Sequence, residues 1–278
     1  RTSNEIRVEG EVKPYSLDTW TGEITEVAEY RYEDGQTVLP VEIADGDVRV
    51  YIFKDTDDQA LHVTSTDAQN ATVSDGSVAV RTTGSGERHV ELSNGERLTV
   101  EAAAPEARSL TGWDVDVESW TEGPLSEARS ETTRSGNYTE EYTVTTEKTN
   151  ISVRMDELRT WDQVPEIGRD VSGTGTYSTS FDWDAASADG AYLDLGPLVE
   201  SATVSVNGKP VDAVNLIDAV VEIPGELLVD GANTLDIVVS TNLANTMLSK
   251  GYHGGNLTEG PRSAGRDRDG NPNYRYDH

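Results

Sequence analysis

The sequence contains no cysteine, which excludes a disulfide framework, a thiolate metal site and a cysteine nucleophile. It also lacks long apolar runs, and none approaches the roughly 18 residues that a membrane-spanning helix needs. The N-terminus has no apolar signal-peptide core, although an exported protein would already have lost that segment. The sequence therefore predicts no membrane span and leaves export open.

Basic side chains are scarce as well. The chain has 22 lysines and arginines against 51 aspartates and glutamates, and its formal net charge is -29. Nucleic-acid recognition begins with a basic patch, so this composition argues against a nucleic-acid partner.

Among the basic residues, only five are lysines. An acidic, lysine-poor surface is typical of proteins from extreme halophiles, because at molar salt the Debye length falls to about 3 Å and carboxylates repel one another little. A mesophilic acidic protein and a calcium-loaded surface are the alternatives. We expect a salt-adapted chain.

Hydrophobic residues make up only 35 % of the chain, and the mean hydropathy is -0.55. Valine, leucine and isoleucine nevertheless recur in ordered patterns, which indicates a folded chain. Strands rich in valine and threonine alternate with glycine turns about every 8–12 residues, and no segment predicts a helix longer than two turns. The expected fold class is all-β, with two or three β-sandwich or jelly-roll modules.

Glycine turns predict the register of several hairpins. A two-residue loop at Asp75-Gly76 fits a type I′ turn, which needs positive φ at both central residues, and a second two-residue loop is expected at Asn207-Gly208. The expected cross-strand pairs are Val73 with Val78 and Val204 with Val211.

The hairpin from His89 to Val100 needs a different loop. Three residues, Ser93-Asn94-Gly95, would pair Val90 with Leu98 and leave Gly95 in the left-handed region. This register gathers the apolar residues on one face: Val90, Leu92, Leu98 and Val100.

Three regions follow along the chain. Residues 1–56 form a strand-rich module, and residues 57–108 hold two hairpins that are either separate from the first module or continuous with it. Residues 109–278 form a larger sandwich. Its segment 121–150 is polar and threonine-rich, so we predict a long surface excursion there.

Five segments of the last region occur in an order that resembles the galactose-binding-like β-sandwich of family 2 and family 106 glycoside hydrolases, and a short polar exit follows them. The resemblance covers about 75 residues. These segments are Gly173–Phe181, Tyr192–Gly196, Ala202–Lys209, Glu222–Leu228 and Asp230–Val239, followed by Asn242–Asn245.

A second resemblance lies upstream. The segments Trp20–Ile24, Asp34-Gly35, Leu39–Ile43 and Val48–Phe53 are similar to the β-module that follows the catalytic barrel in α-L-rhamnosidase-like family 106 enzymes. Together the two resemblances imply the C-terminal, non-catalytic part of an exported rhamnosidase-like glycoside hydrolase.

The parent enzymes carry their catalytic acid and base on a (β/α)₈ barrel of about 250 residues, and the sequence shows no such alternation of strands and helices. The resemblance therefore carries over no catalytic residue. It implies two partners, a catalytic barrel on the same polypeptide and a glycan that contains rhamnose or galactose, and an extracellular or cell-surface location. A free-standing carbohydrate-binding or adhesion module and a structural envelope protein remain alternatives. Four Asn-x-Ser/Thr sequons are compatible with export: Asn70, Asn137, Asn150 and Asn256.

Two tryptophans lie in strand patterns and are expected in the core, Trp113 and Trp183. Aromatic rings outside the strands are better placed to stack on a sugar, because loops at the ends of a sandwich are free to vary. We predict a carbohydrate site in the loops around Trp161 and Tyr252; ordinary packing is the alternative. The neighbouring polar residues that would read sugar hydroxyls are Asp162, His253, Glu166 and Asn256.

One segment near the C-terminus spaces oxygen ligands at alternate positions with a glycine between them. Asp267, Asp269 and Asn271 could bind a calcium ion, which prefers six to eight oxygens. Arg266 and Arg268 oppose cation binding, and a polar Asp-Gly-Asn-Pro turn is the alternative. No other cofactor is predicted.

Overall fold

The computed structural model describes residues 2–55, 60–74, 77–123, 126–132, 138–143, 145–198 and 200–249. Nearly all of the regular structure in them is β-strand, and the exceptions are two single turns of 3₁₀-helix and one short α-helix. This confirms the all-β prediction. Within the described part of the chain, no helix is long and apolar enough to cross a membrane.

The chain divides into two compact units. The first comprises Arg1–Ser109, Phe181–Leu198 and Val204–Asn233. The second comprises Leu110–Ser180, Val199–Thr203 and Thr234–His278. The predicted module boundaries after residues 56 and 108 stay predictions.

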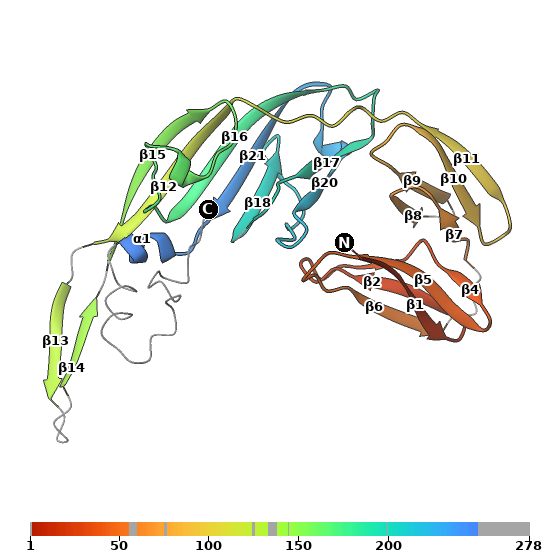
Figure 1. The fold of residues 1–278 in the computed structure, drawn as a ribbon, viewed down its shortest axis with the longest axis horizontal. Coiled ribbons are helices and arrows are strands. Elements are labelled where there is room, and N and C mark those ends of the chain that lie inside the picture. The colour runs from red at the N-terminus through yellow and green to blue at the C-terminus, as the bar shows by residue number, and fades with distance from the viewer. Residues whose placement is uncertain are drawn as a thin grey trace, which may run out of the picture. The chain divides into compact units, whose positions relative to one another are not determined.

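The first unit begins with two small antiparallel sheets (Figure 1). One has the order β1-β5-β4, and the other has the order β3-β2-β6. Their strands are β1 (Thr2–Glu9), β2 (Val12–Leu17), β3 (Ile24–Glu26), β4 (Arg31–Glu33), β5 (Gln36–Ile43) and β6 (Val50–Asp55).

A buried hydroxyl links these two sheets. The Val12 amide donates to Thr37 Oγ1 over 2.8 Å, and that hydroxyl donates to the Gly10 carbonyl, also over 2.8 Å. Val38 and Leu39, which follow Thr37 in β5, have no exposed surface. Because a buried polar group must find partners, Thr37 is held in one arrangement beside this core.

His62 packs in the same unit as a buried aromatic residue. Its ring stacks on Tyr30 with centroids 3.9 Å apart, and it meets Tyr32 edge-to-face with centroids 5.7 Å apart. Its Nδ1 lies 2.9 Å from the Ala60 carbonyl, which can only accept, so Nδ1 carries the proton. Burial lowers the pKa of His62 and favours the neutral ring.

The remaining strands at the start of the first unit form a three-stranded sheet of order β11-β10-β7 and the hairpin β8-β9. They are β7 (Val63–Thr66), β8 (Asn70–Ser74), β9 (Ser77–Arg81), β10 (Gly86–Leu92) and β11 (Arg97–Ala102). Val73 pairs with Val78, which confirms the predicted register; the turn residues Asp75 and Gly76 lie outside the described residues.

The β10-β11 hairpin also has the predicted register. Val90 pairs with Leu98, and Gly95 has a φ of 85°. Val90 and Leu92 are buried, whereas Leu98 and Val100 of the edge strand β11 are exposed.

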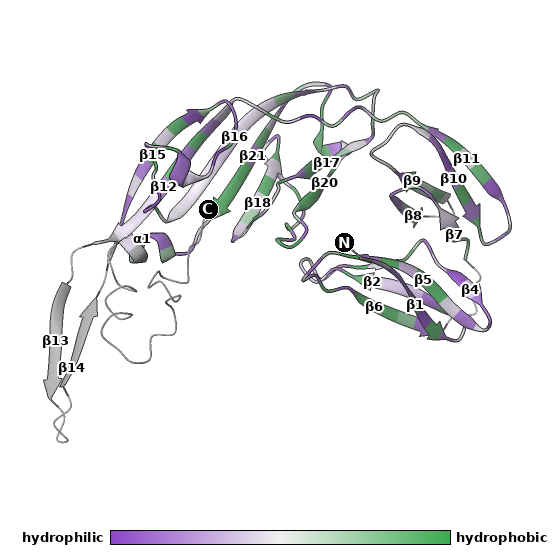
Figure 2. Ribbon diagram, viewed as in Figure 1, coloured by the Kyte–Doolittle hydropathy of each residue, from purple (hydrophilic) through white to green (hydrophobic). Residues whose placement is uncertain are grey.

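A six-stranded sheet has the order β15-β12-β16-β21-β18-β19. Its strands are β12 (Trp113–Glu122), β15 (Thr146–Met155), β16 (Gly173–Trp183), β18 (Ser201–Val206), β19 (Lys209–Pro210) and β21 (Gly231–Ser240). In β15, hydrophobic and hydrophilic residues alternate from Ile151 to Met155, and the colours of Figure 2 show part of this pattern. At the β18-β19 turn, Asn207 and Gly208 have φ of 51° and 73°, and the Val211 amide donates to the Val204 carbonyl, as predicted.

The other elements are short. They are β13 (Ser126–Thr132), β14 (Tyr138–Thr143), β17 (Gly190–Asp194), β20 (Val220–Pro224), η1 (Trp161–Gln163), η2 (Gly225–Leu227) and α1 (Ala244–Ser249).

Two sequence expectations need correction. The polar excursion predicted for residues 121–150 is shorter, because β12 continues to Glu122 and β15 already begins at Thr146. Trp183 and its neighbour Phe181 are half-buried rather than in the core. Trp113, with 3 % of its surface exposed, is a core residue as expected.

Candidate functional site

Strand β12 has one apolar and one polar face. Trp113, Val115 and Val117 are buried, with at most 3 % of their surface exposed. Side chains alternate across a strand, so the residues between them point to the opposite face. On that face lie Asp114, Asp116, Glu118 and Trp120.

The neighbouring strands extend this polar face. In the register of the sheet, Asp116 lies between Ser152 of β15 and Thr176 of β16. The next polar row is formed in the same way, by Asn150, Glu118 and Thr174. These six side chains line an open hollow of about 540 Å³ within the second unit.

Hydroxyl groups connect the hollow to its surroundings. Ser152 Oγ donates to Asp116, and Ser178 Oγ donates to Asp236 over 2.5 Å. Thr174 Oγ1 and Ser240 Oγ lie 3.3 Å apart. The face therefore consists of carboxylates, hydroxyls and one amide, which together can both donate and accept hydrogen bonds.

Trp120 marks one end of the polar face, opposite Lys148 of β15. Its Nε1 donates to Glu118 Oε1 over 2.6 Å, and Lys148 Nζ binds the same oxygen at 2.8 Å. The ammonium also lies 4.6 Å from the centroid of the Trp120 ring. The hydrogen bond from Lys148, followed by the one from Trp120, lowers the pKa of Glu118 and keeps this carboxylate ionised.

Trp161, by contrast, packs on the buried side of the same sheet. Only 4 % of its surface is exposed, and its Nε1 donates to Tyr177 Oη over 2.6 Å. A Cβ atom at Gly175 would lie 2.9 Å from Trp161 Cζ2 and 3.0 Å from Tyr177 Cε2, so only glycine leaves room for this packing. Burial raises the pKa of Tyr177, which stays neutral.

The sequence-predicted loop site is only partly described. Asp162 follows Trp161 in η1 and is exposed, as is Glu166, whereas the ring of Trp161 offers no open face. Tyr252, His253 and Asn256 lie outside the described residues, so a sugar contact from these loops stays a prediction.

The predicted calcium ligands Asp267, Asp269 and Asn271 also lie outside the described residues. Within the ranges that the structure describes, no group of three or more histidines, aspartates and glutamates is placed to hold a metal ion.

Sequence reasoning missed the hollow, although part of its signal was visible. The segment from Trp113 to Trp120 alternates apolar residues with three acids, which places the acids and Trp120 on one face. Asn150 and Lys148 were hidden because they fell within the predicted polar excursion. Their place beside β12 follows from a pairing with residues about 30 positions earlier.

Comparisons with known proteins add little to this description. No protein-family model matches the chain, and no curated protein matches it. Among solved structures, the chain is similar to a rhamnosidase from Novosphingobium sp. PP1Y, with 21 % sequence identity and a TM-score of 0.49. The similarity covers 99 % of this chain but only 20 % of that one, so the chain spans about one fifth of that protein's length.

Proposed function

We propose that this chain is a non-catalytic, carbohydrate-associated part of an exported, rhamnosidase-like glycoside hydrolase, and that it binds sugar in the hollow of β15, β12 and β16. The observation that carries the sugar contact is the pair of cross-strand polar rows beside Trp120.

The chemistry of the hollow suits a sugar. Hydroxyls of a sugar both donate and accept, and the hollow offers carboxylate acceptors together with hydroxyls and the Asn150 amide. The apolar C–H groups of a sugar ring can lie against an aromatic side chain such as Trp120, whose ring also carries Lys148 Nζ 4.6 Å from its centroid. A single sugar at an open, wet surface should bind with a dissociation constant on the order of 0.1–1 mM, or about -4 to -5.5 kcal/mol.

The wider assignment rests on the sequence. The ordered segments between Gly173 and Asn245 resemble the galactose-binding-like sandwich of these enzymes, and the described residues form no (β/α)₈ barrel. The proposed partners are a catalytic barrel on the same polypeptide and a glycan that contains rhamnose or galactose. The proposed location is extracellular or on the cell surface.

A titration tests the sugar contact. Oligosaccharides that contain rhamnose or galactose are added to the protein while amide chemical shifts are followed. We expect saturable shifts in β12, β15 and β16, and loss of binding in Trp120→Ala. The matched control is Trp20→Ala, which removes an exposed tryptophan of the first unit and should leave binding intact.

Two outcomes would contradict the proposal. Saturable binding that Trp120→Ala leaves unchanged would place the site elsewhere, and Tyr252→Ala then tests the loop site. Absence of any binding would leave this chain with a purely structural role beside the barrel.

A further inference from the structure

The charges around the hollow are unequal in number. Among the described side chains of the second unit, this face carries four carboxylates and two cations, Lys148 and Arg154. The acids are Asp114, Asp116, Glu118 and Asp236.

Both cations are already engaged. Arg154 Nη1 lies 2.6 Å from Asp114, and Lys148 Nζ lies 2.8 Å from Glu118. Asp116, in the middle of the hollow, accepts a hydrogen bond from Ser152, and among the described residues no lysine or arginine forms an ion pair with it. The centre of the hollow is thus a carboxylate without a counter-charge.

We infer that the hollow selects uncharged sugars and rejects glycans that carry carboxylate or sulfate groups. This inference rests on the proposed function and specifies the ligand class of the same site. An anionic sugar would place its own charge against Asp116, and like charges in contact repel, whereas a sugar hydroxyl donates to that carboxylate.

The hydrogen-bonding chemistry of Asp116 also favours uncharged over anionic sugars. Its carboxylate oxygens can only accept hydrogen bonds when ionised, and the ring hydroxyls of an uncharged sugar supply the donors. A uronate keeps ring hydroxyls, but in place of the C6 hydroxymethyl group it carries a carboxylate, which is a second acceptor-only group. Lys148 lies one strand away and is neutralised by Glu118, so it does not compensate an incoming anion at Asp116.

The test compares oligosaccharides of equal length, one set built from galactose and the other from galacturonate. Calorimetric titrations are run at about 0.15 M salt, where the Debye length is about 8 Å, and repeated at about 1 M. We expect the neutral set to bind about tenfold more tightly, which equals about 1.4 kcal/mol. The preference should shrink at the higher salt concentration.

Three variants assign the effect. Asp116→Asn keeps an acceptor oxygen but removes the charge, so the difference in affinity between the neutral and the galacturonate set should decrease. Lys148→Gln leaves Glu118 without its cation, so the preference should widen. Glu42→Gln changes the net charge by the same amount as Asp116→Asn, at an exposed position of the first unit, and should leave the preference for the neutral set unchanged.

The results distinguish failure of the selectivity from failure of the sugar contact itself. Equal affinity for both sets, with binding still dependent on Trp120, would overturn the selection and leave the proposed function standing. A preference that Asp116→Asn does not alter would overturn the role of Asp116. Binding of neither set would remove the sugar contact of the proposed function, and the selection with it, and would leave the structural role beside the barrel.

Discussion

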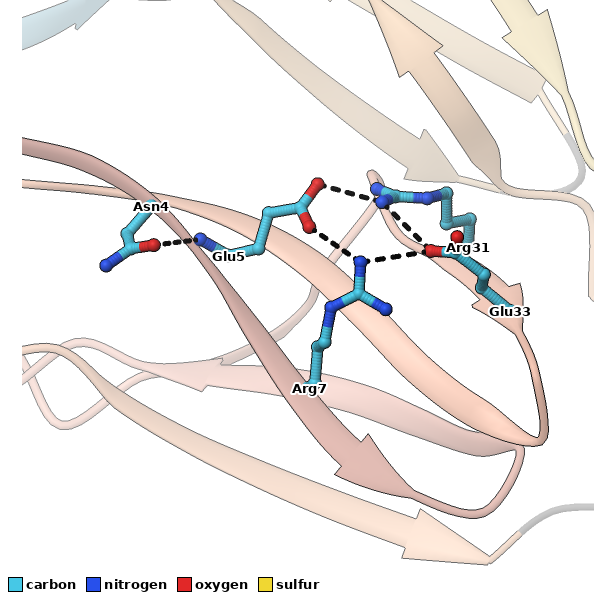
Figure 3. A network of polar contacts seen from close by, with 5 residues as sticks. All are labelled: Asn4, Glu5, Arg7, Arg31 and Glu33. Carbon is cyan, nitrogen blue, oxygen red and sulfur yellow. Dashed lines mark hydrogen bonds and ion pairs between the residues drawn. The ribbon is translucent and has the colours of Figure 1, made fainter.

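Two exposed sheet faces of this protein carry charged side chains and satisfy them in different ways. On the sheet of β1, β5 and β4, Glu5 contacts Arg31 at 2.8 Å and Arg7 at 3.1 Å, and Glu33 contacts both arginines at 3.2 Å (Figure 3). The two acids and two bases form a closed ring of ion pairs. Chiefly because Arg31 donates a hydrogen bond, the pKa of Glu5 is lowered.

The face of β12 lacks this balance. Its acids outnumber its cations, and Asp116 faces the hollow with Ser152 as its hydrogen-bond donor. The ring around Glu5 uses its donors and acceptors internally, whereas the β12 face keeps acceptors available to a ligand. A charged surface therefore indicates a binding face only where its groups are not already paired with one another.

The largest effect should come from the reverse side of the β12 face. Packing on the buried side of this sheet stabilises it, and Trp161 is part of that packing. Trp161→Ala should therefore lower the free energy of unfolding by about 3–5 kcal/mol. Trp120→Ala, on the hollow side, should cost less than about 1 kcal/mol. Chemical denaturation of both variants measures the difference. Trp20→Ala, at an exposed tryptophan, serves as the control. If Trp161→Ala and Trp120→Ala lower the free energy of unfolding equally, the side chains on the hollow side also stabilise the fold.

Salt should act on the two faces in opposite directions. It weakens the ion pairs of the Glu5 ring and relieves the repulsion between carboxylates of the β12 face. The whole chain carries 51 acids and 22 bases, so the screening of carboxylate repulsion should outweigh the weakening of ion pairs. The protein should therefore be more stable in concentrated salt. Between about 0.1 M and about 3 M KCl we expect Tm to rise by about 5–10 °C, or about 2–3 kcal/mol. A flat or falling curve would remove the salt-adapted interpretation.

The sequence predicts local features of this fold well, and the hollow poorly. Gly95 and Asn207-Gly208 determine turns within a few residues, and the pairs Val90–Leu98 and Val73–Val78 follow from turn length and alternation. These are properties of adjacent segments, so a single chain segment contains the information.

The hollow has a different origin. Asp116 meets Thr176 and Ser152 only because β12 pairs with strands that lie about 60 and about 35 residues further along the chain. No local pattern specifies which distant strand becomes the neighbour, and the polar excursion between β12 and β15 concealed the partner. Likewise, Trp161 sits next to Asp162 and near Pro165, a typical loop context, yet its ring is buried because Gly175 leaves a space for it.

A carboxyl titration by NMR would sharpen the comparison. The pKa of Glu5 and that of Glu118 both lie below their ordinary value of 4.5, so each contributes stability above that pH and loses it as pH falls through the lowered pKa. Arg31→Met should raise the pKa of Glu5 toward 4.5. Lys148→Met should raise that of Glu118 only in part, because Trp120 still donates to it. A complete return of Glu118 to its ordinary pKa would show that the tryptophan contributes nothing.

The smallest expected effect concerns one ion pair of the Glu5 ring, Arg7 with Glu33. Exposed pairs are usually worth about 0.2–1 kcal/mol, and membership in a network favours the upper part of that range, because each side chain is already oriented by a second partner. A double-mutant cycle with Arg7→Met and Glu33→Gln measures the coupling. The matched control is Arg97 with Glu91, a cross-strand pair at 2.7 Å whose arginine is 80 % exposed and for which no further salt-bridge partner is found within the described residues. We expect the ring pair to show the larger coupling at low salt and both couplings to fade at high salt. A stronger coupling in the isolated pair Arg97–Glu91 would show that closure of the ring adds no stability. The face of β1, β5 and β4 would then differ from the face of β12 only in its ratio of acids to bases.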